Sequence, residues 1–199
     1  MRTLAIILCL ALAGCGGGSP QVDKLAPDAV ILAFGDSLTF GTGAGPSESY
    51  PAQLERRIGR KVVNAGVPGE LSATGLERLP QVLDEVRPAL LLLCHGGNDF
   101  LRRMDDSIPA ANLRAMLELA RSRGIPVVLL ATPKPTLPPS VPPFFGELAR
   151  QAGVHLVEAA MKEVLSDRSL KSDLVHPNAR GYGEVAAAVE KALKRAGAV

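Results

Sequence analysis

The sequence predicts an α/β fold, a three-layer α/β/α sandwich with a five-stranded parallel sheet in the middle layer. Short apolar runs alternate along the chain with longer amphipathic segments, as in parallel sheets whose two faces are covered by helices. The runs are almost uniformly apolar, which is typical of strands buried on both faces. With 199 residues, 47% of them hydrophobic and 21% charged, the chain is long enough for one domain with a full core.

Five apolar runs are expected to form the strands of this sheet. Each is short, and most end at glycine or at polar residues. They span 29–34, 61–64, 89–94, 125–131 and 154–157. We expect the flavodoxin-like order 2-1-3-4-5, which makes the first and third strands neighbours at the switch point where such sheets bind ligands.

Five segments between and after these runs are expected to be helices. They span 51–58, 72–86, 112–123, 144–152 and 180–196. Ser49 is a suitable cap for the first helix, with Pro51 in its first turn. Pro80 is expected to kink or divide the second helix. Six prolines within 133–143 predict a stiff loop.

The first residues have the composition of an export signal. Arg2 precedes a run of apolar and small residues over 3–13, which is too short to span a bilayer. The run ends in Leu12-Ala13-Gly14-Cys15, which resembles the lipobox of bacterial lipoproteins, where cleavage precedes a lipidated cysteine. We expect a lipoprotein signal peptide over 1–14, a lipidated Cys15 that begins a flexible tether over 15–27, and one domain over 28–199. An ordinary export signal with an incidental cysteine is the alternative.

A lipidated Cys15 would place the protein in a bacterial cell envelope, held to a membrane by its N-terminus. Gly16 is not the aspartate of a retention signal, which favours the periplasmic face of the outer membrane. Cys94 lies in an apolar run and is expected to be a small buried side chain. The net charge is +2, without a basic cluster denser than Arg102-Arg103, which argues against a nucleic-acid partner. We expect a monomer.

The stretch Ala33–Gly45 joins the first strand to a glycine-rich loop, with Asp36 and Ser37 directly after the strand. A small hydroxyl residue just past the carboxyl end of a buried strand lies where open α/β sheets place their active sites. The alternative is that Asp36 or Ser37 only caps the following turn or helix. These residues alone do not decide between the two interpretations.

Three later loops carry groups that an acyl hydrolase could use. The loop over 64–69 offers backbone N–H groups, the loop after the third strand carries Asn98, and Asp173 and His176 precede the last helix. A serine hydroxyl needs a positioned base such as His176. The imidazole needs an acceptor on its other nitrogen, which Asp173 can supply. A tetrahedral oxyanion needs fixed hydrogen-bond donors.

These residues resemble the GDSL, or SGNH, hydrolases from about residue 29 to the C-terminus. Four blocks match in order: Gly35-Asp36-Ser37-Leu38, Gly69, Gly97-Asn98-Asp99 and Asp173-x-x-His176. The resemblance implies the SGNH hydrolase fold over 28–199, with Ser37 as nucleophile and Asp173 and His176 as its partners. It implies Ser37, Gly69 and Asn98 as oxyanion donors, and no cofactor. Gly69 is preferred to Gly66 because it occupies the family's glycine position before the following helix.

Other polar residues have structural interpretations. His95 departs from the family pattern, and a strand-end histidine hydrogen-bonded to backbone is the favoured explanation. His155 is expected to be structural or exposed. Asp36 and Asp99 are expected to fix loop geometry through backbone hydrogen bonds. Asp173 and His176 could instead be two metal ligands, but no further ligand is in a comparable loop, so we expect no metal.

We therefore predict a lipid-anchored serine esterase that hydrolyses small-molecule or lipid esters or thioesters through an acyl-enzyme. Within the family, residues 35–39, 48–51 and 64–66 resemble most the small acyl-CoA thioesterase/lysophospholipase/arylesterase subgroup. The loop over 133–143, with Phe144 and Phe145 beside it, could wall an apolar acyl pocket. One rival is an O-deacetylase of cell-envelope polysaccharide. The other is a non-catalytic, envelope-anchored binding lipoprotein, which would not need the complete set of site residues.

Overall fold

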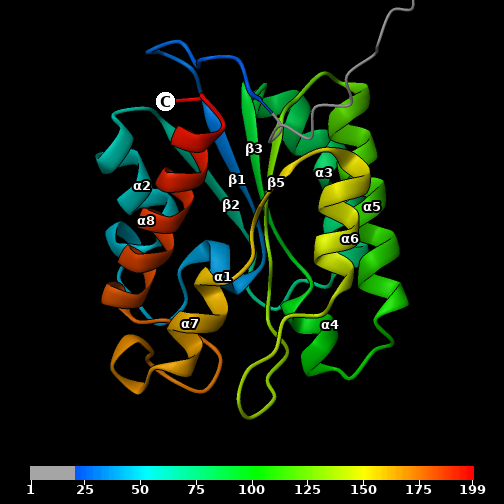
Figure 1. Cartoon of the computed structure of the whole chain (residues 1–199), viewed down its shortest axis with the longest axis vertical. Helices are drawn as coiled ribbons and strands as arrows, with labels where there is room; N and C mark the ends of the chain where they lie inside the picture. Colours follow the sequence, from blue (N-terminus) through cyan, green and yellow to red (C-terminus); the bar gives the residue numbers. More distant parts are fainter. Residues whose placement is uncertain (1–20) are drawn as a thin grey trace, which may run out of the picture.

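A parallel five-stranded sheet forms the middle layer of the molecule in the computed structural model, which describes residues 21–199. The strand order is β2-β1-β3-β4-β5, so the predicted fold class and strand order are confirmed. Helices α2, α7 and α8 cover one face, and α3, α5 and α6 cover the other (Figure 1). The strands are β1 (Ile31–Gly35), β2 (Val62–Gly66), β3 (Leu90–Cys94), β4 (Val127–Leu130) and β5 (His155–Val157).

All of the predicted helices are present, together with three short ones that were not predicted. The predicted ones are α2 (Tyr50–Ile58), α3 (Ser72–Val86), α5 (Ser107–Ser122), α6 (Phe144–Ala152) and α8 (Ala179–Arg195). The additional helices are α1 (Ser37–Phe40), α4 (Gly97–Leu101) and α7 (Ala160–Ser166). All three additional helices lie at the lower end of the molecule in Figure 1, where the strands end.

Two predictions about helices are wrong, and both concern a proline that the helix accommodates. Helix α5 begins at Ser107 rather than at 112. Pro109 lies in its first turn, where a missing N–H group costs no intrahelical hydrogen bond. Helix α3 runs without a break through Pro80, so the predicted division is wrong. Leu79 and Leu83 on either side of Pro80 are buried, and their packing holds this helix in place.

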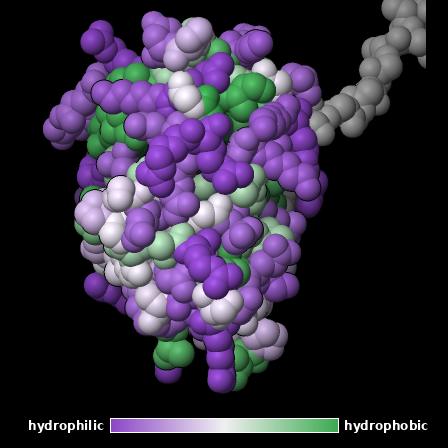
Figure 2. Space-filling model, turned by 90° about the vertical axis from the view of Figure 1, so that its left-hand side faces the viewer, coloured by the Kyte–Doolittle hydropathy of each residue, from purple (hydrophilic) through white to green (hydrophobic). Residues whose placement is uncertain are grey.

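Each face of the sheet has its own hydrophobic core, and β1 contributes to both. Ile31 and Ala33 pack with the side chains of α2 and α8, whereas Leu32 and Phe34 pack with those of α3 and α5. All four side chains are inaccessible to solvent, which explains why the strand sequences are uniformly apolar. The outer face of the α2 and α8 layer is mainly hydrophilic (Figure 2).

The register of the sheet aligns the ends of three strands at one edge. Gly35 at the end of β1 lies opposite Gly66 of β2 and Cys94 of β3. A Cβ atom on Gly35 would overlap the Cys94 carbonyl oxygen and the Thr39 hydroxyl, so only glycine fits here. The loops that follow the three strands are thereby brought together.

The two ends of the described chain meet at the opposite edge of the sheet. Val22 N–H donates to Ala196 O (2.9 Å), Leu25 N–H donates to Ala198 O (2.9 Å), and Leu25 is buried in the core. The expected tether therefore packs against the domain from Val22 onwards. The predicted signal peptide and Cys15 lie outside the described residues. Within residues 21–199, no helix has both the length and the apolar character needed to cross a bilayer.

Candidate active site

Asp36 joins the loop after β1 to the loop after β3. Its Oδ1 atom accepts a hydrogen bond from Leu38 N–H (3.0 Å) and caps α1, and its Oδ2 atom accepts one from Gly97 N–H (3.2 Å). Asp36 is buried, and this burial raises the pKa of its carboxyl. The expected loop-fixing role of Asp36 is confirmed, and the capping interpretation is right for Asp36. Ser37 follows as the first residue of α1.

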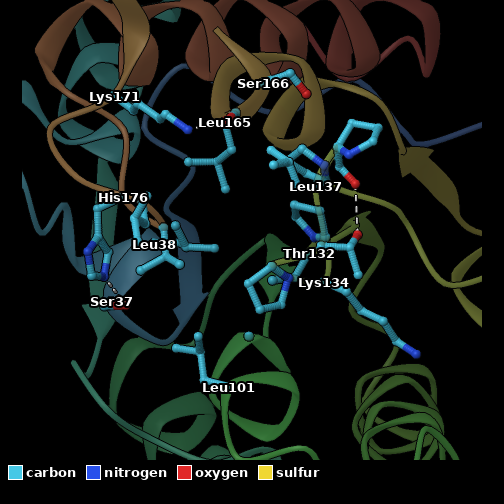
Figure 3. Close-up of a pocket in the computed structure, with 18 of the residues that line it drawn as sticks. Ser37, Leu38, Leu101, Thr132, Lys134, Leu137, Leu165, Ser166, Lys171 and His176 are labelled. Atoms are coloured by element: carbon cyan, nitrogen blue, oxygen red, sulfur yellow. Dashed lines mark hydrogen bonds between the residues drawn. The ribbon is translucent and has the colours of Figure 1, made fainter. Parts of the chain in front are cut away.

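The Ser37 hydroxyl is hydrogen-bonded to an imidazole that is itself held by a carboxylate. Ser37 Oγ lies 3.0 Å from His176 Nε2 (Figure 3), and His176 Nδ1 lies 2.8 Å from Asp173 Oδ2. A carboxylate can only accept, so Nδ1 carries the proton and Nε2 is left as the acceptor for the serine hydroxyl. The structure thus connects, in series, the three residues predicted to be catalytic.

The loop before α8 holds Asp173 and His176 in a fixed geometry. Asp173 Oδ1 accepts hydrogen bonds from the N–H groups of Val175 (2.8 Å) and His176 (2.9 Å). Partial burial alone would raise the pKa of Asp173, but the hydrogen bonds from the His176 ring and these two N–H groups hold it below its ordinary value. Asp173 is therefore a carboxylate at neutral pH, as its hydrogen bond to Nδ1 requires.

Asn98 reaches the same site from α4, across from Ser37. Its Nδ2 atom donates to the carbonyl oxygen of Glu70 (3.0 Å), which leaves the second amide hydrogen for another acceptor. Gly69, the residue before Glu70, has φ +79°, and its N–H group makes no hydrogen bond within residues 21–199. Gly66 N–H instead donates to Asn64 Oδ1 (2.9 Å).

Asp99 fixes the start of α3 against α4, as the sequence predicted for a loop-organising carboxylate. It is fully buried and accepts hydrogen bonds from Ser72 N–H (2.9 Å) and Ser72 Oγ (2.6 Å). Asn112 Nδ2 donates to the same Ser72 hydroxyl (2.9 Å). The segment that carries Asn98 is therefore tied to the segment that follows Gly69.

A cavity of about 470 Å³ opens beside Ser37, Asn98 and His176. This volume is within the range of about 300–1,000 Å³ that is usual for small-molecule sites. Gly69 is not among the residues that line the cavity. Leu38, Leu101 and Leu165 lie around the hollow, whereas the Lys134 side chain extends away from it (Figure 3). The remaining walls come from residues 132–139 and from the segment between α7 and His176.

Two of these walls show what the sequence did and did not reveal. The proline-rich loop lines the cavity as predicted, but Phe144 and Phe145 do not. Phe145 is buried and the two rings stack with centroids 4.5 Å apart, so they belong to the core. The α7 wall, with Leu165, was missed, although the apolar residues Ala160, Met161, Val164 and Leu165 have helical spacing.

His95 and Cys94 lie beneath the site at the end of β3. His95 is fully buried, its Nδ1 atom accepts from Gly96 N–H (3.0 Å), and its Nε2 atom lies 3.0 Å from Glu70 Oε2. The predicted backbone hydrogen bond is present, and the Glu70 carboxylate is a partner that the sequence did not reveal. Cys94 is a buried side chain as predicted, and burial raises the pKa of its thiol to about 12. Its thiol is therefore uncharged.

His155 lies far from Asp173 and His176, the two residues that were weighed as metal ligands. His155 is the first residue of β5 and is partly buried, at the edge of the sheet opposite the site. Asp173 and His176 contact each other and Ser37. Within residues 21–199, no group of three or more His, Cys, Asp and Glu side chains is arranged to hold a metal ion.

Comparison with known proteins gives a consistent result. The profile of the GDSL-like lipase/acylhydrolase family matches residues 33–183. Esterase TesA of Pseudomonas aeruginosa is 33% identical over 191 residues, which cover 89% of this chain and 90% of that protein. Thioesterase 1/protease 1/lysophospholipase L1 of Escherichia coli K12 is 31% identical over 156 residues, covering 74% and 75% of the two chains. A crystal structure of TesA superposes with a TM-score of 0.75 at 30% identity, covering 84% of this chain and 99% of that one.

Proposed function

The chain belongs to the GDSL-like lipase/acylhydrolase family and is a serine esterase; we propose that Ser37 is its nucleophile. The observation that carries this proposal is the series of hydrogen bonds from Ser37 through His176 to Asp173, at the mouth of a cavity. A serine hydroxyl is a weak nucleophile on its own, and a base within hydrogen-bond reach makes it reactive. The Ser37–His176 distance of 3.0 Å meets that requirement.

In the first half of the reaction, Ser37 Oγ attacks the carbonyl carbon of an ester or thioester. His176 Nε2 takes the hydroxyl proton, and the Asp173 carboxylate stabilises the imidazolium that forms. The tetrahedral intermediate then collapses, the bond to the leaving group breaks, and His176 gives its proton to the departing alcohol or thiol. The products of this half are a free alcohol or thiol and an acyl group on Ser37.

In the second half, His176 Nε2 takes a proton from a water molecule, and the resulting hydroxide attacks the acyl carbon. Collapse of the second intermediate breaks the bond to Ser37 Oγ, which takes its proton back from His176. The carboxylic acid leaves, and the enzyme returns to its starting protonation state. The hydrogen bonds that Asp173 accepts from His176 Nδ1–H and from the N–H groups of Val175 and His176 keep the same Nε2 atom available in both halves.

We assign the oxyanion hole to Ser37 N–H, Gly69 N–H and the Asn98 side-chain amide. Asn98 has an amide hydrogen left after its bond to Glu70, and Gly69 N–H has no partner within the described chain. Gly66 N–H is already bonded to Asn64, which supports Gly69 rather than Gly66. Donors fixed in advance are worth about 2.7–4 kcal/mol each in the barrier.

The cavity supports acyl groups that are apolar, either aliphatic or aromatic. The lining of the cavity is mainly apolar and includes leucines from three helices and prolines of the 132–139 loop. Burial of an acyl chain stabilises binding by about 0.8 kcal/mol for each CH₂ group. The Escherichia coli relative is named both a thioesterase and a lysophospholipase. We propose lipid-like or aryl esters and the corresponding thioesters as substrates.

The test is hydrolysis of p-nitrophenyl esters, from acetate to palmitate, by residues 21–199. We expect activity with an optimum above acetate, and Ser37→Ala should reduce kcat by about 10⁴-fold or more while the protein stays folded. Ser122→Ala is the matched control, because that exposed hydroxyl at the end of α5 bonds only to Leu119 O. Undiminished hydrolysis by Ser37→Ala would refute the assignment of the nucleophile.

The chain-length profile also separates the rival functions. A steep preference for acetate would favour deacetylation of an envelope polysaccharide over lipid-like substrates. An unmodified protein that hydrolyses no ester and resists a fluorophosphonate would favour the non-catalytic binding lipoprotein. Labelling of Ser37 by the fluorophosphonate would exclude that last reading.

We also propose that the chain is anchored to the periplasmic face of the outer membrane through lipid on Cys15. This proposal comes from the sequence of residues 1–16. In a bacterial host given labelled palmitate, the full chain should carry label in the membrane fraction. Cys15→Ala should abolish the label, whereas Cys94→Ala, which changes a buried thiol, should keep it. Label that persists in Cys15→Ala would refute lipidation at this residue.

A further inference from the structure

One residue, Glu70, is attached to two of the groups assigned to the oxyanion hole. Its backbone follows Gly69 directly, and its carbonyl oxygen accepts the hydrogen bond from Asn98 Nδ2 (3.0 Å). The loop that carries Gly69 is exposed at Val67, Pro68 and Gly69. It is otherwise held by hydrogen bonds from Val67 N–H to Gly35 O (3.0 Å) and from Glu70 N–H to Val67 O (3.2 Å). A shift of Glu70 would therefore move both donors.

The Glu70 side chain is anchored below this loop by two partners. Arg78 of α3 binds both carboxylate oxygens, Nε to Oε1 at 2.8 Å and Nη2 to Oε2 at 2.7 Å. His95 Nε2 lies 3.0 Å from Oε2. The Glu70 side chain is only 4% exposed, so these bonds form away from bulk water, where they are stronger than on a surface. Arg78 is fixed in turn by the Phe34 ring, 4.2 Å below its guanidinium.

His95 faces Glu70 with a defined nitrogen. Its Nδ1 atom accepts a hydrogen bond from Gly96 N–H (3.0 Å), so in the neutral ring the proton lies on Nε2 and is donated to Glu70. His95 directly follows β3, in the middle of the sheet, and is fully buried. The carboxylate is thereby tied to the buried end of the central strand.

Helix α3 is shaped to leave room for this imidazole. Gly75 lies within α3, and a Cβ atom at this position would overlap Nε2, Cδ2 and Cε1 of His95. Glycine inside a helix is destabilising relative to alanine. The His95 ring fills the space that Gly75 leaves, so the imidazole packs directly against the backbone of α3.

We propose that His95 is a positioning residue for the oxyanion hole. By fixing the Glu70 side chain, it holds the Glu70 carbonyl that orients the Asn98 amide, and it holds the adjacent Gly69 N–H in place. This inference rests on the proposed oxyanion roles of Gly69 and Asn98. Donors stabilise an oxyanion because they are aimed before the charge develops, so a displaced Glu70 weakens the transition state more than the bound substrate.

The test compares two substitutions of His95 with a matched control on a p-nitrophenyl ester. His95→Leu keeps the volume and removes the donor, whereas His95→Gln keeps an amide hydrogen for Glu70. His155→Leu is the control, because it makes the same change in β5, away from the site. Active-site titration with a fluorophosphonate gives kcat per functional molecule, and a trifluoromethyl ketone, which forms a tetrahedral oxyanion on Ser37, reports on the oxyanion hole directly.

We expect His95→Leu to lower kcat about 10-fold, with KM within 2-fold. This loss is smaller than the roughly 10²–10³-fold that is typical of deleting an oxyanion donor. The affinity for the trifluoromethyl ketone should fall in parallel with kcat. His95→Gln should recover most of both, and His155→Leu should change neither. If His95 had only a structural role, its substitution would lower the fraction of titratable sites and the unfolding temperature. It would leave kcat per titrated site unchanged.

Gly75→Ala provides a second test that leaves every proposed site residue intact. Its methyl group should displace the imidazole and lower kcat per site in the same way. In a His95→Ala background, where the methyl group has space, Gly75→Ala should cause no further loss.

The outcomes separate this inference from the proposed function. If the unmodified protein hydrolyses esters and His95→Leu, His95→Gln and Gly75→Ala all keep kcat per site within 2-fold, the positioning role is refuted and the esterase stands. An unmodified protein without esterase activity would refute both. If His95→Leu fails to fold, the decision passes to Gly75→Ala, which keeps the imidazole in the chain and is expected to displace it.

Discussion

Burial and ion pairing act in opposite directions on the Glu70 carboxyl. Burial alone would raise its pKa, but hydrogen bonds and charge from Arg78 and His95 lower it to about 2, from an ordinary 4.5. The second effect is larger because three donor atoms surround the two oxygens. Glu70 is therefore ionised in the folded protein at every pH at which an esterase would normally be assayed.

This depressed pKa predicts how stability depends on pH. Because the folded pKa is below the unfolded one, ionised Glu70 stabilises the fold above pH 4.5, and that stabilisation is lost as the pH falls from 4.5 towards 2. At about 1.4 kcal/mol per pH unit, the unmodified protein should lose at most about 3.5 kcal/mol from this group. In Glu70→Gln this part of the loss should be missing, as measured by urea unfolding across the pH range.

Glu77→Gln is the control for this prediction, because Glu77 is exposed on α3, the helix that carries Arg78. Its stability should follow that of the unmodified protein at each pH. Identical pH profiles for Glu70→Gln and the unmodified protein would contradict the inferred ion pairing.

The placement of individual residues was predictable where a strand end carried a recognisable motif. Ser37, Asn98, Asp173 and His176 meet at the carboxyl edge of the sheet, because parallel strands bring their following loops together. The contact between His95 and Glu70 was not predictable. Alternation along β3 places His95 on the same face as Leu93, but it does not tell which loop, 25 residues away in the chain, covers that face.

At the scale of elements, α1 packs closely against the ends of β1 and β2. The contact depends on Gly35, where a Cβ atom would overlap the backbone of β3 and the side chain of Thr39 in α1. Neither neighbour is the flexible end of a long side chain, so the overlap cannot be relieved cheaply. The backbone that carries Ser37 therefore requires glycine at this position.

Gly35→Ala should therefore destabilise the protein strongly, and Gly146→Ala should not. We expect Gly35→Ala to lower the free energy of unfolding by about 3 kcal/mol or more, as overpacking in a core does, and to lower kcat because Ser37 moves. Gly146 lies in α6, and a methyl group there would contact only Arg150 Nη1 at 3.5 Å. Gly146→Ala should stabilise the protein by about 0.5–1 kcal/mol through helix propensity.

Urea unfolding and ester hydrolysis of the two variants measure these effects. A Gly35→Ala protein as stable and as active as the unmodified one would contradict the close packing at the end of β1.

Element lengths explain which helices the sequence revealed. The predicted helices have nine residues or more, long enough to show an apolar face. The missed ones have four, five and seven residues, and short helices owe their formation to tertiary packing rather than to propensity. Asp36, for example, stabilises α1 because one of its carboxylate oxygens caps the helix. The other oxygen accepts a hydrogen bond from the loop after β3.

At the scale of the whole molecule, the sheet separates two regions with different tasks. The cavity and its loops occupy the carboxyl edge, and the two ends of the described chain meet at the amino edge (Figure 1). Two backbone hydrogen bonds connect residues 22–25 to residues 196–198, and Arg60 Nη2 donates to Leu25 O (3.0 Å). The beginning of the described chain is therefore a structural part of the domain, far from the chemistry.

This separation predicts that stability and activity can be changed independently at Leu25. The Leu25 side chain is 7% exposed and packs in the core, so Leu25→Ala should cost about 2–3 kcal/mol, at the low end for a buried leucine. For a chain of this size that corresponds to roughly 5–10 °C in unfolding temperature. Lys24→Ala, an exposed neighbour in the same segment, should stay within about 0.5 kcal/mol of the unmodified protein. Below the unfolding temperature, kcat per titrated active site should be the same in all three proteins. A drop in kcat with Leu25→Ala would mean that the two edges of the sheet are coupled, whereas an unchanged unfolding temperature would mean that residues 22–25 do not pack on the domain.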